Sequence, residues 1–136
     1  MIRKKKTHRQ KLVKELDTLA KSIARKRDGR CLLCGSTENL QAHHYIHTVA
    51  YSTKYRWDLR NLCTVCAGCH LYKIHSTASF RYTEPLRKAV LINKIITEKE
   101  LEEISNDREL ARFSIGDLES IKEHLEEEKK KLEELK

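Results

Sequence analysis

Near its start the chain shows the hydrophobic pattern of an amphipathic helix. Apolar residues recur every three or four positions, and most residues between them are charged or polar. The apolar positions are Leu12, Leu16, Leu19 and Ile23. Because Asp28-Gly29 is a helix-ending pair, the pattern predicts a helix to about residue 27. Residues 1–8 before it form a basic arm.

The middle of the chain predicts two short strands followed by a helix. Alternation over residues 40–46 favours one strand, residues 62–65 favour a second, and the chain from His70 onward has helical character. Strand, long loop, strand and helix form a ββα unit. The loop contains Trp57, which we interpret as a packing anchor in preference to a base-stacking platform.

Three further helices are predicted beyond residue 75, each from a start signal. Thr83 can cap a helix that has Pro85 in its first turn. Thr97 and Glu100 fit a capping box, and Ser114 starts the third helix. That third helix carries a seam of apolar residues interrupted by Glu128, which favours a packed or dimerising helix over a solvated one. The seam is Leu118, Ile121, Leu125, Leu132 and Leu135.

Charge is divided unevenly along the 136 residues, whose formal net charge is +8. Residues 1–75 carry 16 Lys/Arg against 5 Asp/Glu, whereas residues 76–136 carry 12 against 15. This asymmetry indicates a half that binds a polyanion, with nucleic acid favoured over a merely soluble basic face. The predicted phosphate contacts are Arg56, Arg60 and Lys73, although the two arginines fit surface charge equally well.

No apolar run approaches the roughly 18–20 residues that span a bilayer. The basic N-terminus is followed by a charged helix, which is unlike a secretory signal. We therefore expect an intracellular protein, and in that compartment paired cysteines serve as metal ligands more often than as disulfides.

Four of the five cysteines form two Cys-x-x-Cys pairs, Cys31 with Cys34 and Cys66 with Cys69. Both thiolates of such a pair can reach one metal ion, so two pairs complete a tetrahedral zinc site. The alternative is four free buried thiols.

The predicted fold class is α+β and mostly helical. Residues 1–28 form the basic arm and first helix, residues 29–80 a zinc-stabilised ββα core, and residues 81–136 a helical extension that could dimerise.

Several histidines are surplus to this zinc site. His43 and His44 are adjacent on a predicted strand, so they point to opposite faces, and His70 can close on the same place. One imidazole of the pair could bind metal while the other addresses water or backbone. Imidazole suits Zn, Ni, Co or Cu, and a site completed by phosphate oxygens and water could also take Mg or Mn. The alternative is that these residues are spare zinc ligands or polar groups of the core.

The motifs C-x-x-C-G, H-H-x-I and N-L-x-T-x-C-x-x-C-H occur in this order over roughly residues 25–75. This pattern resembles the HNH (ββα-metal) nucleases, in the subset with a structural zinc. The resemblance implies that His44 is the general base, that His43 and His70 bind the catalytic metal, and that Asn61 braces the loop and orients the base.

Two positions depart from the HNH pattern. His75 resembles a closing histidine that some members use as a third metal ligand, but those members space it four residues from the previous ligand. Here the interval is five, with Ile74 in the four-residue slot, which argues against His75 as a ligand. Cys63 stands where relatives carry an apolar residue, so we expect it in the core. The implied reaction is hydrolysis of DNA phosphodiester bonds to 5′-phosphate and 3′-hydroxyl ends, with Mg²⁺ or Mn²⁺ as catalytic metal.

A looser resemblance covers more of the chain. The runs A-H-H-Y-I-H-T-V, K-Y-R-W-D-L-R-N and F-S-I-G-D-L-E-S-I look like the phage recombination nucleases of the Rap (NinG) type. These are associated with branched DNA such as D-loops and Holliday junctions, which implies action in the cytoplasm of a host cell and suits a two-fold dimer. The alternatives are a duplex-nicking or homing HNH nuclease and a non-catalytic zinc module that binds DNA.

Overall fold

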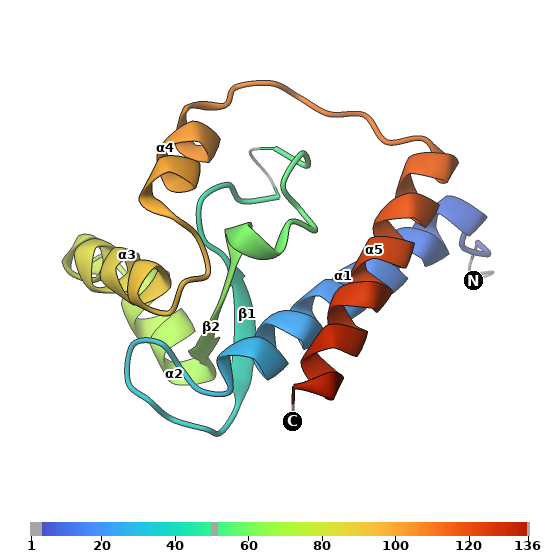
Figure 1. Ribbon diagram of the computed structural model, residues 1–136. Helices are drawn as coiled ribbons and strands as arrows, with labels where there is room; N and C mark the ends of the chain where they lie inside the picture. The colour runs from blue at the N-terminus through green and yellow to red at the C-terminus, as the bar shows by residue number, and fades with distance from the viewer. Residues whose placement is uncertain (1–3, 50–51, 136) are drawn as a thin grey trace.

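The computed structural model describes residues 4–49 and 52–135, so the first three residues of the predicted basic arm lie outside the described residues. The fold is mixed α+β and mostly helical, as predicted, with a two-stranded sheet between two groups of helices (Figure 1). No helix of the described ranges is long and apolar enough to cross a membrane. The main elements are α1 (His8–Asp28), β1 (Leu40–His44), β2 (Leu62–Cys66), α2 (Ala67–Cys69), α3 (Thr83–Ile92), α4 (Glu98–Asn106) and α5 (Ile115–Glu134).

Helix α1 begins and ends at local signals in the sequence. The Thr7 side chain accepts a hydrogen bond from the backbone N–H of Gln10, whose side chain accepts from the N–H of Thr7 in return. At the other end Gly29 has φ 69°, and its N–H donates to the carbonyl of Arg25. Glycine adopts this left-handed conformation without a steric penalty, so the helix stops where the sequence predicts.

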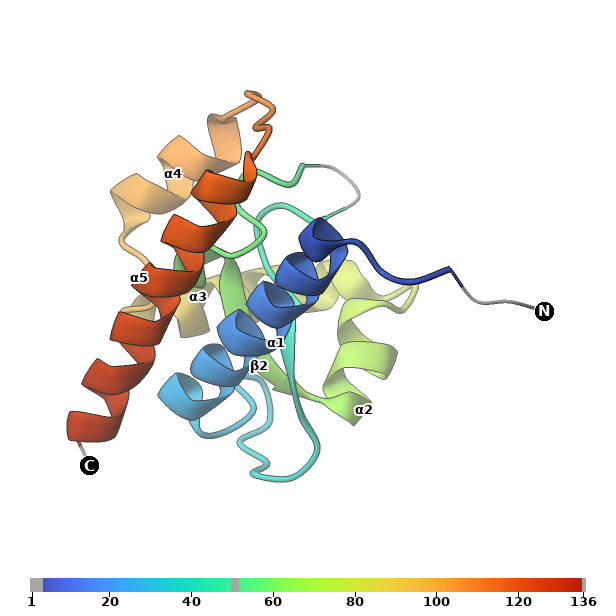
Figure 2. The ribbon, with the colours of Figure 1, turned by 90° about the vertical axis from the view of Figure 1, so that its right-hand side faces the viewer.

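Helices α1 and α5 lie side by side and run in the same direction (Figures 1 and 2). Their starts are joined by a bond from Arg9 to the carbonyl of Phe113, and their ends by an ion pair between Lys26 and Glu133. The apolar faces of the two helices meet in one core with Trp57 and Leu62, so the seam of α5 packs within the chain except for Leu135, which is exposed. The buried helical residues of this core are Leu12, Leu16, Ala20, Ile23, Ala24, Leu118 and Leu125.

Strand β2 is buried on both faces because it separates two cores. Leu62 belongs to the α1–α5 core, whereas Cys63 and Val65 belong to a second core formed with α3 and α4. Strand β1 pairs with β2 in antiparallel register, with His43 opposite Cys63 and His44 opposite Leu62. Residues directly opposite each other share a face of the sheet, so His44 faces the α1 side and His43 faces the other side.

The starts of the later helices follow the predictions with one difference. Capping boxes at Thr97 and Ser114 begin α4 and α5. Thr83 is the first residue of α3 and not its cap, because the 3₁₀ turn η3 (Ser79–Tyr82) runs directly into the helix. The cap position therefore falls on Tyr82, which makes no side-chain capping bond.

Candidate metal centres

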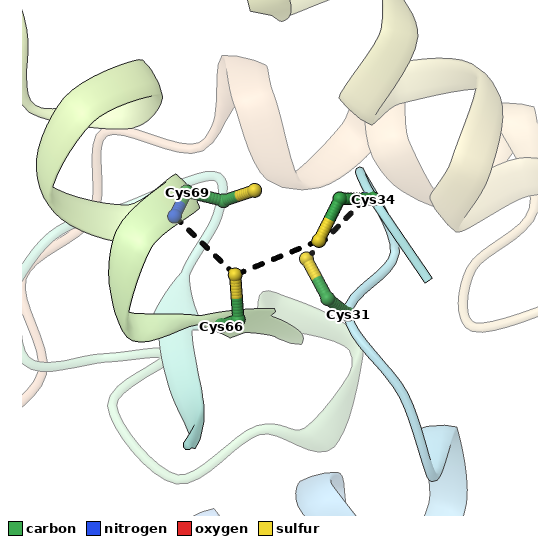
Figure 3. Close-up of side chains that lie close together, drawn as sticks. All are labelled: Cys31, Cys34, Cys66 and Cys69. Atoms are coloured by element: carbon green, nitrogen blue, oxygen red, sulfur yellow. Dashed lines mark hydrogen bonds between the residues drawn. The ribbon is translucent and has the colours of Figure 1, made fainter. Parts of the chain in front are cut away.

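The four paired cysteines converge on one point. Their sulfur atoms all lie within 4.8 Å of one another, and Figure 3 shows them directed inward from the segment after α1 and from the ends of β2 and α2. The sulfur atoms of Cys34 and Cys66 are 3.6 Å apart. Backbone N–H groups of Cys34 and Cys69 donate to the sulfurs of Cys31 and Cys66 at 3.5 and 3.4 Å. These four cysteines are close enough to bind one zinc ion.

Position, and not pKa, separates the fifth cysteine from the four ligand thiols. Burial opposes the charged form of Cys31, but hydrogen bonds from backbone N–H groups, first that of Cys34, lower its pKa to about 6. Burial raises the pKa of both Cys69 and Cys63 to about 12. Cys63 lies outside the group of four sulfur atoms and is fully buried in the second core, so it is a core residue, as expected from the sequence.

Three histidines form a second cluster on the α3 side of the sheet. His43 comes from β1, whereas His70 and His75 flank the turn η2 (His70–Ile74). The ring centroids are 4.5 Å apart for His70 and His75, 5.1 Å for His43 and His70, and 5.6 Å for His43 and His75. One nitrogen from each ring lies within 4.8 Å of the others, which allows all three to reach one ion.

A neighbour on β1 orients the His70 ring. The Nδ1 atom of His70 lies 2.8 Å from the Gln41 side-chain oxygen, which can only accept, so Nδ1 carries the proton. The Nε2 atom of His70 then carries the lone pair and lies 2.9 Å from Nε2 of His75. A polar group that fixes the ring of a ligand histidine in this way is common around protein metal sites.

His75 reaches the cluster because η2 is a π-helical turn. The backbone N–H of His75 donates to the carbonyl of His70 at 3.1 Å, which is the i→i+5 bond of a π-helix. In an α-helix, positions five apart point about 140° away from each other, so a five-residue interval would separate the two rings. The wider turn instead places His75 next to His70, while Ile74 packs against the second core.

The cluster environment favours neutral imidazoles. Burial, followed by the neighbouring rings of His70 and His75, lowers the pKa of His43 to about 4. Burial, followed by His75, lowers the pKa of His70. A histidine must be neutral to bind metal, so His43 and His70 are in the state that a ligand requires near pH 7.

His44 stands on the other face of β1. Its Nε2 atom lies 3.0 Å from the carbonyl oxygen of Arg56, which can only accept, so Nε2 carries the proton and Nδ1 has a free lone pair. Burial lowers the pKa of His44, although the bond to Arg56 opposes this. His44 is therefore a half-buried neutral imidazole with one nitrogen able to accept a proton.

Comparison with known families decides where this chain belongs. The family described as Bacteriophage Lambda NinG protein matches residues 1–135. The chain is a member of the NinG family. This family is related to phage recombination. Searches of curated proteins and of solved structures gave no match.

In this NinG-family protein Asn61 ties the long loop to the end of β1. The side chain is fully buried, and its oxygen accepts from the backbone N–H groups of Ile46 and His47 at 2.7 and 3.0 Å. Its nitrogen donates to the carbonyls of His47 and Tyr55 at 2.9 and 3.1 Å. These four hydrogen bonds occupy backbone groups that a longer strand would use for pairing, which explains why β1 ends at His44 and not at Ile46. They also brace the loop that carries the carbonyl bonded to His44.

The arginines predicted to contact phosphate are both bound to carboxylates. Arg56 donates to the two oxygens of Asp17 at 2.9 and 2.7 Å. Arg60 donates to Asp58 and to Glu100, with shortest distances of 2.6 and 2.8 Å. Both side chains therefore join elements of the fold, and their contact with phosphate stays a prediction.

Trp57 and Lys73 have different surroundings. Trp57 is buried and donates from Nε1 to Asp17 at 2.9 Å, so it packs within the protein. The Lys73 ammonium lies 5.5 Å from the centre of the Tyr82 ring, which is a cation–π distance. Its role as a DNA contact stays a prediction.

Proposed function

We propose that this NinG-family protein is a metal-dependent DNA endonuclease of the HNH (ββα-metal) type. The observation that carries the proposal is the placement of four imidazoles around the end of β1. His43, His70 and His75 converge on one point, and His44, the next residue of β1, faces α1 with Nδ1 able to accept a proton. The hairpin followed by α2 and η2 supplies the strand–strand–helix order that the HNH resemblance implies.

Each of these residues has a separate role in the proposed reaction. His44 takes a proton from water through Nδ1, and the resulting hydroxide attacks phosphorus in line with the leaving 3′ oxygen. Asn61 and Arg56 hold the loop whose carbonyl keeps the His44 ring in the required tautomer. A divalent ion bound by His43, His70 and His75 would offset the charge on the phosphate and the leaving oxygen. The products are a 5′-phosphate and a 3′-hydroxyl.

The cysteine centre has a structural role in this proposal. Zinc bound by the four cysteines joins the segment after α1 to the end of β2. Because His70 directly follows Cys69, the same ion fixes the start of the turn that presents His70 and His75. A small core of this kind gains stability from bound metal.

We propose branched DNA as the substrate because the family is related to phage recombination. A junction has two strands to be cut symmetrically, which a two-fold dimer would serve in the cytoplasm of the host cell. Because the apolar seam of α5 packs on α1, a dimer would use a different surface.

The test compares cleavage of a four-way junction with cleavage of a duplex of the same sequence, in Mn²⁺ and in Mg²⁺. We expect junction cleavage that His44→Ala abolishes while the zinc content is unchanged. His124→Ala removes an exposed imidazole on α5 and serves as the matched control, with activity retained.

Two other outcomes would redirect the proposal. Equal cleavage of junction and duplex would favour a duplex-nicking or homing HNH nuclease. Binding of DNA without cleavage in any divalent ion would overturn the nuclease proposal in favour of a non-catalytic zinc module.

A further inference from the structure

A groove lined by lysines runs between α1 and α5. It has a volume of about 630 Å³, and two carboxylates, Glu15 and Glu126, line it together with the lysines. Lys122 pairs with Glu15 at 2.9 Å. Within residues 4–49 and 52–135, none of the other four lysines has a carboxylate oxygen within 4 Å. The lysines of the groove are Lys6, Lys11, Lys14, Lys122 and Lys129.

Two of these lysines crowd each other. The charge of the Lys14 ammonium lowers the pKa of Lys6. Like charges held together without a carboxylate between them repel, and an anion bound in the groove would remove that repulsion. A phosphodiester backbone supplies a regular series of such anions.

Another lysine of α1, Lys21, lies beside the histidines. It is half-buried and one helical turn from Asp17, which binds the Arg56 guanidinium at 2.7 Å. The carbonyl of Arg56 in turn contacts His44, so Lys21 lies on the α1 face that borders this imidazole.

The neighbouring arginines are held in close ion pairs, whereas Lys21 interacts with Asp17 through charge alone among the residues that the structure describes. Arg56 is bound to Asp17 and Arg27 to Asp28. No hydrogen bond or ion pair within 4 Å joins the Lys21 side chain to another residue in the part of the chain that the structure describes. Lys21 is therefore available to an incoming phosphate at the place where the proposed reaction would occur.

Lys14 and Lys21 connect the groove to the histidines. Seven residues make almost two helical turns, so the two side chains leave α1 within about 20° of each other and about 10 Å apart along the axis. This distance equals the axial rise of about three nucleotides in one strand. Successive phosphates of one DNA strand could thus contact both Lys14 and Lys21.

We propose that α1 carries a phosphate track, along which a DNA strand runs from Lys21 at the histidines to the lysine groove between α1 and α5. The Lys21 end rests on the proposed nuclease function. The groove end concerns binding alone and can be measured whether or not the protein cleaves DNA.

The first test measures binding of a labelled four-way junction by fluorescence anisotropy over a range of salt concentrations, without divalent ions. Each phosphate contact contributes about 0.9 to the slope of log K against log [salt]. We expect Lys11→Gln with Lys14→Gln to lower the slope by about 2, and Lys21→Gln to lower it by about 1. The control is Lys88→Gln with Lys99→Gln, which removes the same charge from exposed positions of α3 and α4.

A slope reduction no larger in the groove double variant than in this control would overturn the track, and so would absence of DNA binding by the unmodified protein. Glutamine on exposed or half-buried helix positions should preserve the fold, which circular dichroism checks.

The second test separates binding from positioning at the Lys21 end. We expect Lys21→Gln to lower kcat for junction cleavage about tenfold or more, and Lys21→Arg to restore most of it, because either cation can contact a phosphate oxygen. The groove variant should raise KM and leave kcat nearly unchanged. A Lys21→Gln enzyme with unchanged kcat and salt slope would remove Lys21 from the track. If the unmodified protein binds with the expected slopes but never cleaves, the nuclease proposal fails while the track stands.

Discussion

Replacing Asp17 by alanine should destabilise the fold and disturb His44. Asp17 accepts three hydrogen bonds across a gap of about forty residues, two from Arg56 and one from Trp57, at 2.9, 2.7 and 2.9 Å. Arg56 carries the carbonyl that contacts His44. The Asp17→Ala variant therefore leaves a guanidinium and a buried indole N–H without their acceptor, and it frees the segment that orients the His44 ring.

The size of the effect follows from the burial of the pair. A hydrogen bond to a charged group contributes about 1.5–3 kcal/mol when buried. The Asp17 and Arg56 side chains are 26% and 24% exposed, so the lower end applies and the three bonds are not independent. We expect a loss of about 3 kcal/mol for Asp17→Ala, which corresponds to about 10 °C in Tm for a chain of this length. Asp17→Asn keeps one acceptor oxygen and should lose about half as much.

Urea unfolding followed by circular dichroism and by the fluorescence of the single tryptophan measures this loss. Glu15→Ala is the matched control, because Glu15 lies on the same helix in an exposed pair with Lys122 and should leave the unfolding midpoint nearly unchanged. The reasoning is refuted if Asp17→Ala costs no more than Glu15→Ala, or if it cleaves junctions at the rate of the unmodified protein.

The same interaction predicts a dependence on pH. Burial raises the pKa of Asp17, but hydrogen bonds from Arg56 and Trp57 outweigh it, so the folded pKa lies below the ordinary value. The stabilisation is therefore complete above about pH 4 and is lost as the pH falls through the folded pKa. Unfolding measured from pH 6 down to pH 2 should show a steeper fall for the unmodified protein than for Asp17→Asn.

Three further changes test the metal centres and the loop. Cys66→Ser should remove the bound zinc and unfold the ββα region, whereas Cys63→Ala should keep one zinc per chain by metal analysis, at a modest cost in stability. His75→Ala should weaken binding of Mn²⁺ or Ni²⁺ at the histidine cluster by about tenfold or more in calorimetry, with the zinc retained, and unchanged affinity would exclude His75 as a ligand. Because three imidazoles suit these ions better than Mg²⁺, cleavage should be faster in Mn²⁺ than in Mg²⁺. Asn61→Ala removes four hydrogen bonds to the backbone, two of them buried and two part-buried, and should lower the free energy of unfolding by about 3 kcal/mol, against little change for Asn93→Ala at an exposed position.

Local signals allowed much of the secondary structure to be predicted from the sequence. The helix starts at Thr97 and Ser114 depend on side chains only three residues away, and the end of α1 depends on the conformation of Gly29. The cysteine pairs were recognisable for the same reason, because their two-residue spacing already determines how the thiols meet.

Features that depend on long-range contacts could not be predicted. For Arg56 the sequence left phosphate contact and surface charge equally open, because its partner Asp17 lies 39 residues earlier, on a helix whose orientation the local pattern does not give. His75 was a doubtful ligand because it stands five residues after His70 and not four, and no pattern in the sequence marks the π-helical turn that brings it to His70. Nothing in the sequence distinguishes Lys21 from the other lysines of its helix, and only the packing of α1 against the hairpin does so.

The parallel pairing of α1 and α5 has a consequence during synthesis. The contact between Arg9 and Phe113 joins residues 104 positions apart, so the leucines of α1 have no permanent partner while the intervening chain is being made. The apolar face of α1 must be kept from aggregating until α5 has left the ribosome. Termination of synthesis within α5 would leave this face permanently exposed. The pairing of α1 with α5 is thus among the slowest events in folding, since contacts between residues so far apart in the sequence form late.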